Sequence, residues 1–164
     1  MNSVYIISGP PGVGKSTISL DLSKRINKSA YIDGDYIYHQ VVNGYVSPWE
    51  EGNHLDILYR ILIYSTNLYI ENGYNVIIDY FLDYEDYLKI KNHINCKNIN
   101  YYVLLADNQT IINRDSNRDN SKKMGNRVID AIKEIEGENI PKEYIIDTSN
   151  KSIEEVIICI LKKQ

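Results

Sequence analysis

A glycine-rich stretch near the N-terminus, SGPPGVGKST at residues 8–17, constrains this chain more than any other segment. It follows an apolar run, VYIIS, that predicts a buried strand, and precedes isoleucine and leucine residues whose spacing of four predicts a helix. Glycines allow successive backbone amides to turn toward an anion, and the positive end of the helix points to the same place. Gly9, Gly14, Lys15 and Ser16 match the phosphate-binding loop, or P-loop, in full. The expected ligand is therefore ATP or GTP.

The side chains of this loop suit the same chemistry. Lys15 is a long, mobile cation that can reach the β- and γ-phosphates, and the Ser16 hydroxyl can coordinate Mg²⁺. We therefore expect Lys15 to be catalytic and Ser16 to be a metal ligand, with ATP and Mg²⁺ as the cofactors. The residues of this loop that are expected to hold the nucleotide are Gly9, Pro11, Gly12, Val13, Gly14, Lys15, Ser16 and Thr17.

Strand-like and helix-like segments alternate along the whole sequence. The expected strands cover residues 4–8, 30–33, 74–80, 99–105 and 143–146. The expected helices cover residues 15–26, 55–72, 84–93, 110–117 and 128–136, and a last helix follows the capping box SIEE at residues 152–155. Residues 36–53 are expected to be irregular. This alternation predicts a single α/β domain over residues 1–164, with a parallel sheet covered by helices on both faces.

Composition limits the partners that such a domain can have. The formal net charge is −4 at pH 7, so the chain lacks the broad positive field that nonspecific nucleic-acid binding needs. Cys96 and Cys159 fit no metal or disulfide spacing. The N-terminus has no signal-peptide pattern, and no apolar run reaches the roughly 18 residues of a membrane span. We expect a cytoplasmic monomer or homodimer whose partner is a small molecule, not a nucleic acid or a membrane.

Three acidic residues stand where strands are expected to end. Asp33 and Asp35 leave the second strand close to the P-loop, where one could hold Mg²⁺ through water and the other could accept a proton from an attacking hydroxyl. Asp79 ends the third strand and could support the same Mg²⁺. Each has a local alternative, because Asp is common in turns. No Glu follows Asp79, which favours phosphoryl transfer over hydrolysis by an activated water.

An arginine-rich segment follows the fourth expected strand. Arg114 and Arg118 are one helical turn apart, and Arg127 lies further along the chain. Triphosphate chemistry needs mobile cations and a flap that excludes water from the reaction. We therefore predict a lid at about residues 114–127, with a solvated basic helix face as the alternative.

These three features together resemble a known group of enzymes. Residues 9–17, the Asp33-Gly34-Asp35 stretch and the arginine-rich segment make the chain similar to the small P-loop kinases of the nucleoside-monophosphate-kinase fold. Within that group it is most similar to gluconate kinase, shikimate kinase and chloramphenicol phosphotransferase, with tunicamycin-resistance proteins and uncharacterised AAA-type ATP-binding kinases nearby. The resemblance implies a three-layer P-loop NTPase fold, with a five-stranded parallel sheet in order 2-3-1-4-5 and a small lid between strands 4 and 5.

The same resemblance implies a role for several residues. Asp33 would serve the Mg²⁺ sphere, and Asp35 would be the catalytic base on the acceptor hydroxyl. Arg114 would pack near the adenine, and Arg118 would be catalytic by contacting the transferred phosphate. Thr148, in the segment after the fifth strand, would help to hold the base.

The segment at about residues 36–72 is expected to bind the acceptor, and its first part departs from the gluconate-kinase pattern. Tyr38 and Trp49 could form an aromatic wall for a ring-bearing acceptor, or could simply pack against the helix beneath. By the resemblance, Arg60 and Arg127 could bind an anionic part of the substrate. His39 is an alternative to an aspartate as the base.

The predicted function is therefore a Mg²⁺-ATP-dependent phosphotransferase that acts on a hydroxyl of a small molecule, such as a sugar acid or an antibiotic. A nucleoside or nucleotide kinase is an alternative, although a phosphate-bearing acceptor would call for more arginines near Arg60. A non-catalytic, ATP-binding resistance or regulatory protein is a second alternative. A kinase of nucleic-acid ends is disfavoured by the acidic charge.

Overall fold

Five parallel strands form the central sheet of the computed structural model, which describes residues 2–117, 123–137 and 139–163. Their spatial order is β2-β3-β1-β4-β5, which confirms the predicted order. All four strand pairings are parallel, so the carboxyl ends of the strands meet at one edge of the sheet. The strands are β1 (Ser3–Ser8), β2 (Ser29–Asp33), β3 (Asn75–Asp79), β4 (Asn98–Leu105) and β5 (Ile145–Asp147).

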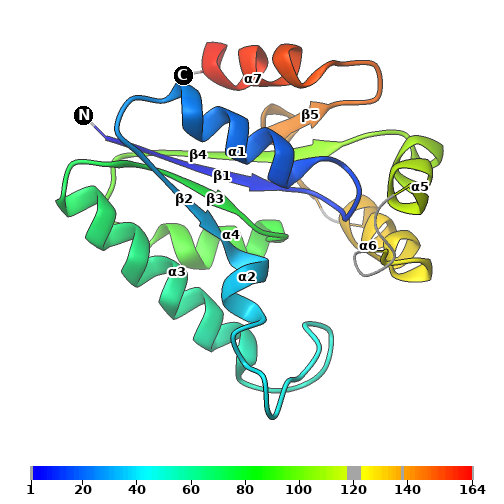
Figure 1. Cartoon of the computed structure of the whole chain (residues 1–164), viewed down its shortest axis with the longest axis horizontal. Coiled ribbons are helices and arrows are strands. Elements are labelled where there is room, and N and C mark those ends of the chain that lie inside the picture. Colours follow the sequence, from blue (N-terminus) through cyan, green and yellow to red (C-terminus); the bar gives the residue numbers. More distant parts are fainter. Residues whose placement is uncertain (1, 118–122, 138, 164) are drawn as a thin grey trace.

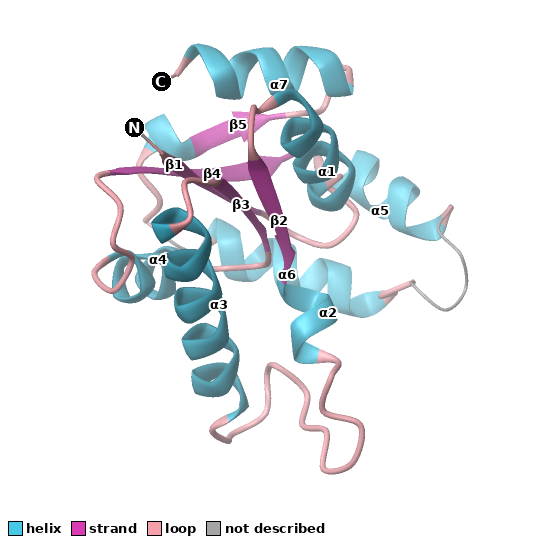
Figure 2. Ribbon diagram, turned by 60° about the vertical axis from the view of Figure 1, so that its left-hand side comes forward, coloured by secondary structure: helices cyan, strands magenta, loops and turns pink. Residues whose placement is uncertain are grey.

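Helices cover both faces of this sheet, as predicted (Figure 1). Helices α1 (Lys15–Arg25) and α7 (Ile153–Lys162) lie on one face, and α3 (His54–Glu71) and α4 (Tyr84–Lys91) lie on the other (Figure 2). The remaining helices, α2 (Gly34–Tyr38), α5 (Asn108–Ser116) and α6 (Asn126–Glu136), lie toward the carboxyl edge of the sheet. Among the described residues, no helix combines the length and the apolar character needed to cross a membrane.

Each face of the sheet carries its own apolar core because successive strand residues point to opposite faces. Ile7 and Ile77 pack with Leu22 of α1 on one face. Ile6 and Ile78 pack with Leu62 of α3 on the other. Strands β1 and β3 are therefore buried on both faces, which explains why they read as continuous apolar runs.

The ends of several elements differ from the sequence-based expectation by one or two residues, and one helix was not expected. A short helix, α2, begins at Gly34, because the Asp33 side chain accepts a hydrogen bond from the Tyr36 amide and caps the helix. The expected fifth strand begins later, at Ile145, because residues 142–144 form a 3₁₀ turn after Pro141. The predicted capping box is confirmed, since Ser152 and Glu155 cap α7 reciprocally.

Candidate active site

The P-loop connects β1 to α1 at the carboxyl edge of the sheet, with Gly14 as the residue before the helix. Gly9 shows why a glycine is needed there: its φ is +135°, and a Cβ at this position would lie 2.3 Å from the backbone oxygen of Leu104. Lys15 is buried, and its Nζ donates a hydrogen bond to the Pro10 carbonyl at 3.3 Å. The loop therefore presents its backbone and the Lys15 ammonium at the start of α1, where an anion is favoured. The other predicted nucleotide-binding residues of the loop, Pro11, Gly12, Val13, Ser16 and Thr17, lie in the same turn or in the first turn of α1.

Two predicted metal ligands face each other across neighbouring strands beside this loop. Asp33 of β2 is in register with Asp79 of β3, so both carboxyl groups leave the sheet at the same level and on the same face. Asp79 is only 3% exposed, and one of its oxygens accepts a hydrogen bond of 2.9 Å from the Tyr31 hydroxyl. Burial raises the pKa of Asp79, and the Lys15 charge with the Ser16 and Tyr31 hydroxyls opposes that rise. Asp79 is thus coupled directly to the P-loop.

This arrangement suits Mg²⁺ better than a metal ion whose ligands all come from protein side chains. The described residues contain no group of three or more His, Cys, Asp or Glu side chains that could hold a metal ion. Mg²⁺ prefers oxygen ligands, keeps several waters, and is usually held by one or two carboxylates together with substrate phosphates. The Ser16 hydroxyl and the carboxylates of Asp33 and Asp79 supply such a set next to the loop.

Asp35, the predicted base, is exposed in the first turn of α2, two residues beyond the end of β2. Its carboxylate has no hydrogen-bond partner within the described ranges. His39, the alternative base, lies one turn further along, with Nδ1 2.6 Å from the backbone oxygen of Asp35. The His39 ring also stacks on Tyr45, with ring centroids 5.6 Å apart. One His39 nitrogen is therefore already engaged, whereas the Asp35 carboxylate is open.

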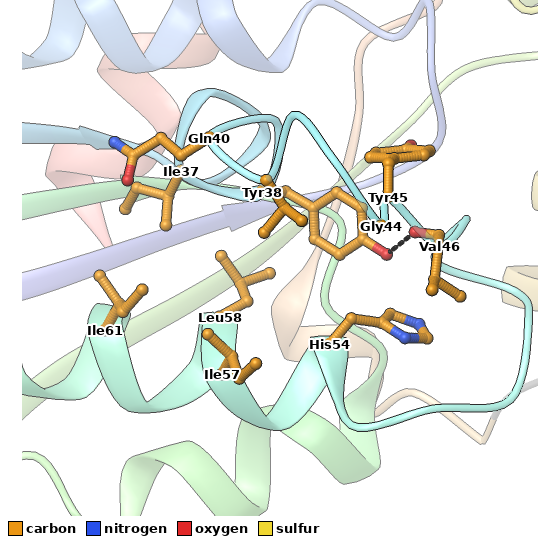
Figure 3. Close-up of a pocket in the computed structure, with 11 residues that line it drawn as sticks. Ile37, Tyr38, Gln40, Gly44, Tyr45, Val46, His54, Ile57, Leu58 and Ile61 are labelled. Atoms are coloured by element: carbon orange, nitrogen blue, oxygen red, sulfur yellow. Dashed lines mark hydrogen bonds between the residues drawn. The ribbon is translucent and has the colours of Figure 1, made fainter.

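The loop at residues 39–53 joins α2 to α3 and protrudes from the sheet (Figure 2). It lies in the segment that was expected to bind the acceptor and is called the acceptor loop for that expectation. Tyr38 anchors its start: the ring is buried, and the hydroxyl donates a hydrogen bond to the Val46 carbonyl (Figure 3). Tyr38 therefore packs against the helix beneath, which is the structural alternative raised above. A mainly apolar cavity of about 140 Å³ lies beside it, between the acceptor loop and Ile57, Leu58 and Ile61 of α3 (Figure 3).

Two predicted substrate residues, Trp49 and Arg127, are brought together although they are far apart in the sequence. Trp49 of the acceptor loop is 57% exposed, and the Arg127 guanidinium carbon of α6 lies 4.7 Å from the centre of its ring. Arg127 also pairs with Glu134 through two hydrogen bonds of 2.8 and 3.2 Å. Another predicted substrate residue, Arg60, lies on α3, where its side chain is 79% exposed and pairs with Asp56.

On the opposite side of the P-loop, Arg114 contacts Thr148, and both residues were expected near the nucleotide base. The Arg114 guanidinium donates to the Val13 carbonyl at 3.2 Å and to the Thr148 hydroxyl and carbonyl at 3.4 Å each. Thr148 is buried, and its amide is bonded to the carbonyl of Leu105. A planar cation and a threonine thus flank the loop where β5 ends. Arg118, which was predicted to contact the transferred phosphate, lies outside the described residues, as does part of the predicted lid.

Sequence reasoning missed two residues that hold this site together. Tyr31 was read only as a strand residue, but it fixes Asp79 from the neighbouring strand. Asp115 is buried, and its carboxylate accepts hydrogen bonds from the amides of Met124 and Gly125. It therefore ties the start of α6 to the end of α5. Neither set of hydrogen bonds could be predicted from the spacing of residues in the sequence. The position of Asp115 next to Arg114 in an expected helix was the one feature that could have indicated a role for it.

A parallel sheet in the order 2-3-1-4-5, with a P-loop between its central strand and the following helix, defines a P-loop NTPase fold. The chain belongs to the AAA_18 family, described as an AAA domain, which it matches over residues 6–145. That match covers most of the sheet and both sides of the site.

Solved structures share this fold at low sequence identity. A sugar kinase from Janibacter sp. superposes with a TM-score of 0.79 and 14% identity, covering 99% of this chain and 94% of that one. A gluconokinase from Sinorhizobium meliloti gives a TM-score of 0.72 and 11% identity, covering 99% and 90%. The tunicamycin resistance protein of Deinococcus radiodurans gives a TM-score of 0.70 and 18% identity, covering 99% and 95%. The expected resemblance to gluconate kinase and tunicamycin-resistance proteins is thereby confirmed at the level of the fold.

A curated relative is similar over one segment alone. The tRNA dimethylallyltransferase of Petrotoga mobilis is 40% identical over 52 residues, which make up 31% of this chain. The chain spans 17% of the length of that relative. The likeness therefore concerns a segment, not the whole of either protein.

Proposed function

We propose that this protein is a Mg²⁺-ATP-dependent phosphotransferase that transfers the γ-phosphate to a hydroxyl of a small molecule. The observation that carries this proposal is the placement of an open carboxylate, Asp35, two residues after Asp33 of the Asp33–Asp79 pair that borders the P-loop. Nucleotide-binding groups and a proton acceptor thus stand side by side at one edge of the sheet. The folds of a sugar kinase and a gluconokinase support the same reaction class.

In the proposed reaction, the P-loop holds the triphosphate. Backbone amides around Gly12 and Gly14 surround phosphate oxygens, and Lys15 neutralises charge on the β- and γ-phosphates. Ser16, with Asp33 and Asp79 acting through water, would hold Mg²⁺, which supplies further neutralisation of the phosphate charge.

The acceptor side then supplies the nucleophile. The hydroxyl oxygen of the acceptor attacks the γ-phosphorus, and the bond from that phosphorus to the bridging oxygen of the β-phosphate breaks, so that ADP leaves. The hydroxyl proton passes to the Asp35 carboxylate. Positioning and charge neutralisation would provide most of the rate enhancement.

The charges near Asp35 favour an acceptor without a phosphate group. Asp35 and Glu50 act on the Tyr45 hydroxyl, and Asp86 lies on the same side of the sheet. Arg127 is paired with Glu134, and Arg60 is paired with Asp56 on α3. In the described part of the chain, the acceptor side is therefore rich in carboxylates, and a phosphate-bearing acceptor would be repelled.

An acceptor panel tests this proposal. ADP release would be measured with Mg²⁺-ATP and gluconate, glucose, shikimate, chloramphenicol, an aminoglycoside, adenosine or AMP. Stimulation by an acceptor, lost in Lys15→Ala and reduced at least a hundredfold in Asp35→Asn, is the expected result. Asp56→Asn, which removes an exposed carboxylate from α3, is the matched control and should keep full activity. ATP binding without stimulation by any acceptor would favour a non-catalytic ATP-binding protein instead.

A further inference from the structure

A buried tyrosine beside Asp35 has a hydroxyl that the fold does not use. Tyr80 follows the last residue of β3 and is 4% exposed. Its ring packs in the core formed with Tyr38 and Leu82, on the face that α3 covers. Within residues 2–117, 123–137 and 139–163, its hydroxyl has no hydrogen-bond partner, and solvent reaches the oxygen. A buried ring with a free polar tip is unusual, because buried tyrosine hydroxyls normally find a partner.

The position of this ring is closely determined. Gly34, the residue before Asp35, lies so near to Tyr80 that a Cβ on it would be 2.7 Å from the Tyr80 Cβ and Cδ2 atoms. The start of α2 therefore rests directly on Tyr80, and the phenol lies on the same side of the sheet as Asp35. A phenolic hydroxyl can donate as well as accept a hydrogen bond, so Tyr80 can serve as a donor here.

Two neighbouring tyrosine hydroxyls on this side of the sheet are already engaged. The Tyr38 hydroxyl is bonded to Val46, and the Tyr59 hydroxyl is bonded to Asp86. In the described part of the chain, the Tyr80 hydroxyl is thus an unused donor and the Asp35 carboxylate an unused acceptor, and the packing of Gly34 on Tyr80 links the two residues. Two adjacent oxygens of one ligand can satisfy both groups, with one hydroxyl donating to Asp35 and the other oxygen accepting from Tyr80.

We infer that Tyr80 is an acceptor-binding residue, and that the acceptor is an uncharged diol or polyol whose second oxygen accepts a hydrogen bond from the Tyr80 hydroxyl. This inference rests on the proposed function, because it uses Asp35 as the group that receives the reacting hydroxyl. It narrows the substrate class from any hydroxyl compound to one with a neighbouring oxygen. Tyr80 takes no part in the bonds that form and break.

Tyr80→Phe tests the inference, since it removes an unpaired hydroxyl and leaves the ring packing intact. With the panel acceptor that gives the highest turnover, KM for the acceptor should rise about tenfold, and KM for ATP should stay within twofold. The monodeoxy analogue that lacks the neighbouring hydroxyl should bind wild type about tenfold more weakly than the parent acceptor. It should also show the same KM with wild type and Tyr80→Phe. The comparison of the parent acceptor with its monodeoxy analogue on wild type does not depend on the folding of any variant.

Tyr102→Phe is the matched control. Tyr102 is also 4% exposed but lies on the opposite face of the sheet, where its hydroxyl donates to the Ile160 carbonyl. Its loss should lower Tm and leave KM for the acceptor unchanged. Acceptor turnover with an unchanged KM in Tyr80→Phe would overturn the role of Tyr80 and leave the proposed function standing. Absence of turnover with every acceptor in wild type would overturn the proposed function and this inference together.

Discussion

Adding one methyl group at Gly34 should displace the helix that carries the predicted base. The new Cβ would lie 2.7–2.8 Å from three atoms at the root of the Tyr80 ring, which cannot rotate away. Overpacking of this kind costs about 1–3 kcal/mol, and the better helix propensity of Ala returns up to about 1 kcal/mol. Gly34→Ala should therefore lower the free energy of unfolding by up to about 3 kcal/mol, with about 1–2 kcal/mol as the middle of the range. Because α2 must shift, the turnover number for the acceptor should fall at least tenfold, with KM for ATP nearly unchanged.

Urea unfolding and steady-state kinetics together check this prediction. Gly137→Ala is the control, because Gly137 has an ordinary φ of −77° and a Cβ there would meet its nearest neighbour at 3.4 Å. That variant should be neutral or slightly more stable, since Ala reduces the freedom of the unfolded chain. If Gly34→Ala keeps both wild-type stability and turnover, then contact with Tyr80 does not determine the position of α2.

The other predictions concern two contacts of the site. The Arg127–Trp49 contact should contribute about 0.5–1 kcal/mol to the free energy of unfolding. A double-mutant cycle with Arg127→Met and Trp49→Leu should give a coupling energy of that size in urea unfolding, whereas additive effects would show that the contact is neutral. Tyr31→Phe removes a hydrogen bond that stabilises the ionised form of Asp79, so the pKa of Asp79 should rise further. The acidic limb of the pH–activity profile should then move to higher pH. An acidic limb that does not move would argue against a role for Asp79 in activity. Because the pKa of Asp79 is raised in the folded state, protonation of its carboxyl group stabilises the folded protein. That contribution to the free energy of unfolding is complete below the ordinary pKa of 3.8 and is lost as pH rises through the folded pKa. Asp79→Asn should remove that decline in urea titrations above pH 3.8, and an unaltered decline would place its origin elsewhere.

Local patterns were sufficient to predict most of the sheet. Strands β1 and β3 and the P-loop depend on continuous apolar runs and on glycines at fixed spacing, which are visible in short windows of sequence. The order of the strands followed from the resemblance to small P-loop kinases and is confirmed. The short helix α2 was missed because its five residues carry no periodicity, and its start depends on the Asp33 side chain. The start of β5 was misplaced because Pro141 begins a 3₁₀ turn.

The site was harder to predict because its contacts join distant segments. The carboxylates at the strand ends could be identified from the sequence, but the Tyr31 hydroxyl bond to Asp79 depends on the register of β2 against β3. The Arg127–Trp49 contact depends on where the acceptor loop turns, and no local pattern encodes it. Tyr80 was overlooked because a tyrosine at the end of an apolar strand is usually a core residue, and its unused hydroxyl is visible only in the folded chain.

Following the γ-phosphate itself is the most direct test of the central claim. ATP labelled with ³²P at the γ-position would be incubated with Mg²⁺, the panel acceptor and either wild type or Asp35→Asn, and the products would be separated. We predict that wild type moves the label to the acceptor, and that Asp35→Asn moves at least a hundredfold less while binding ATP equally well. Label found solely in inorganic phosphate, or remaining in ATP with every acceptor, would contradict transfer to a hydroxyl.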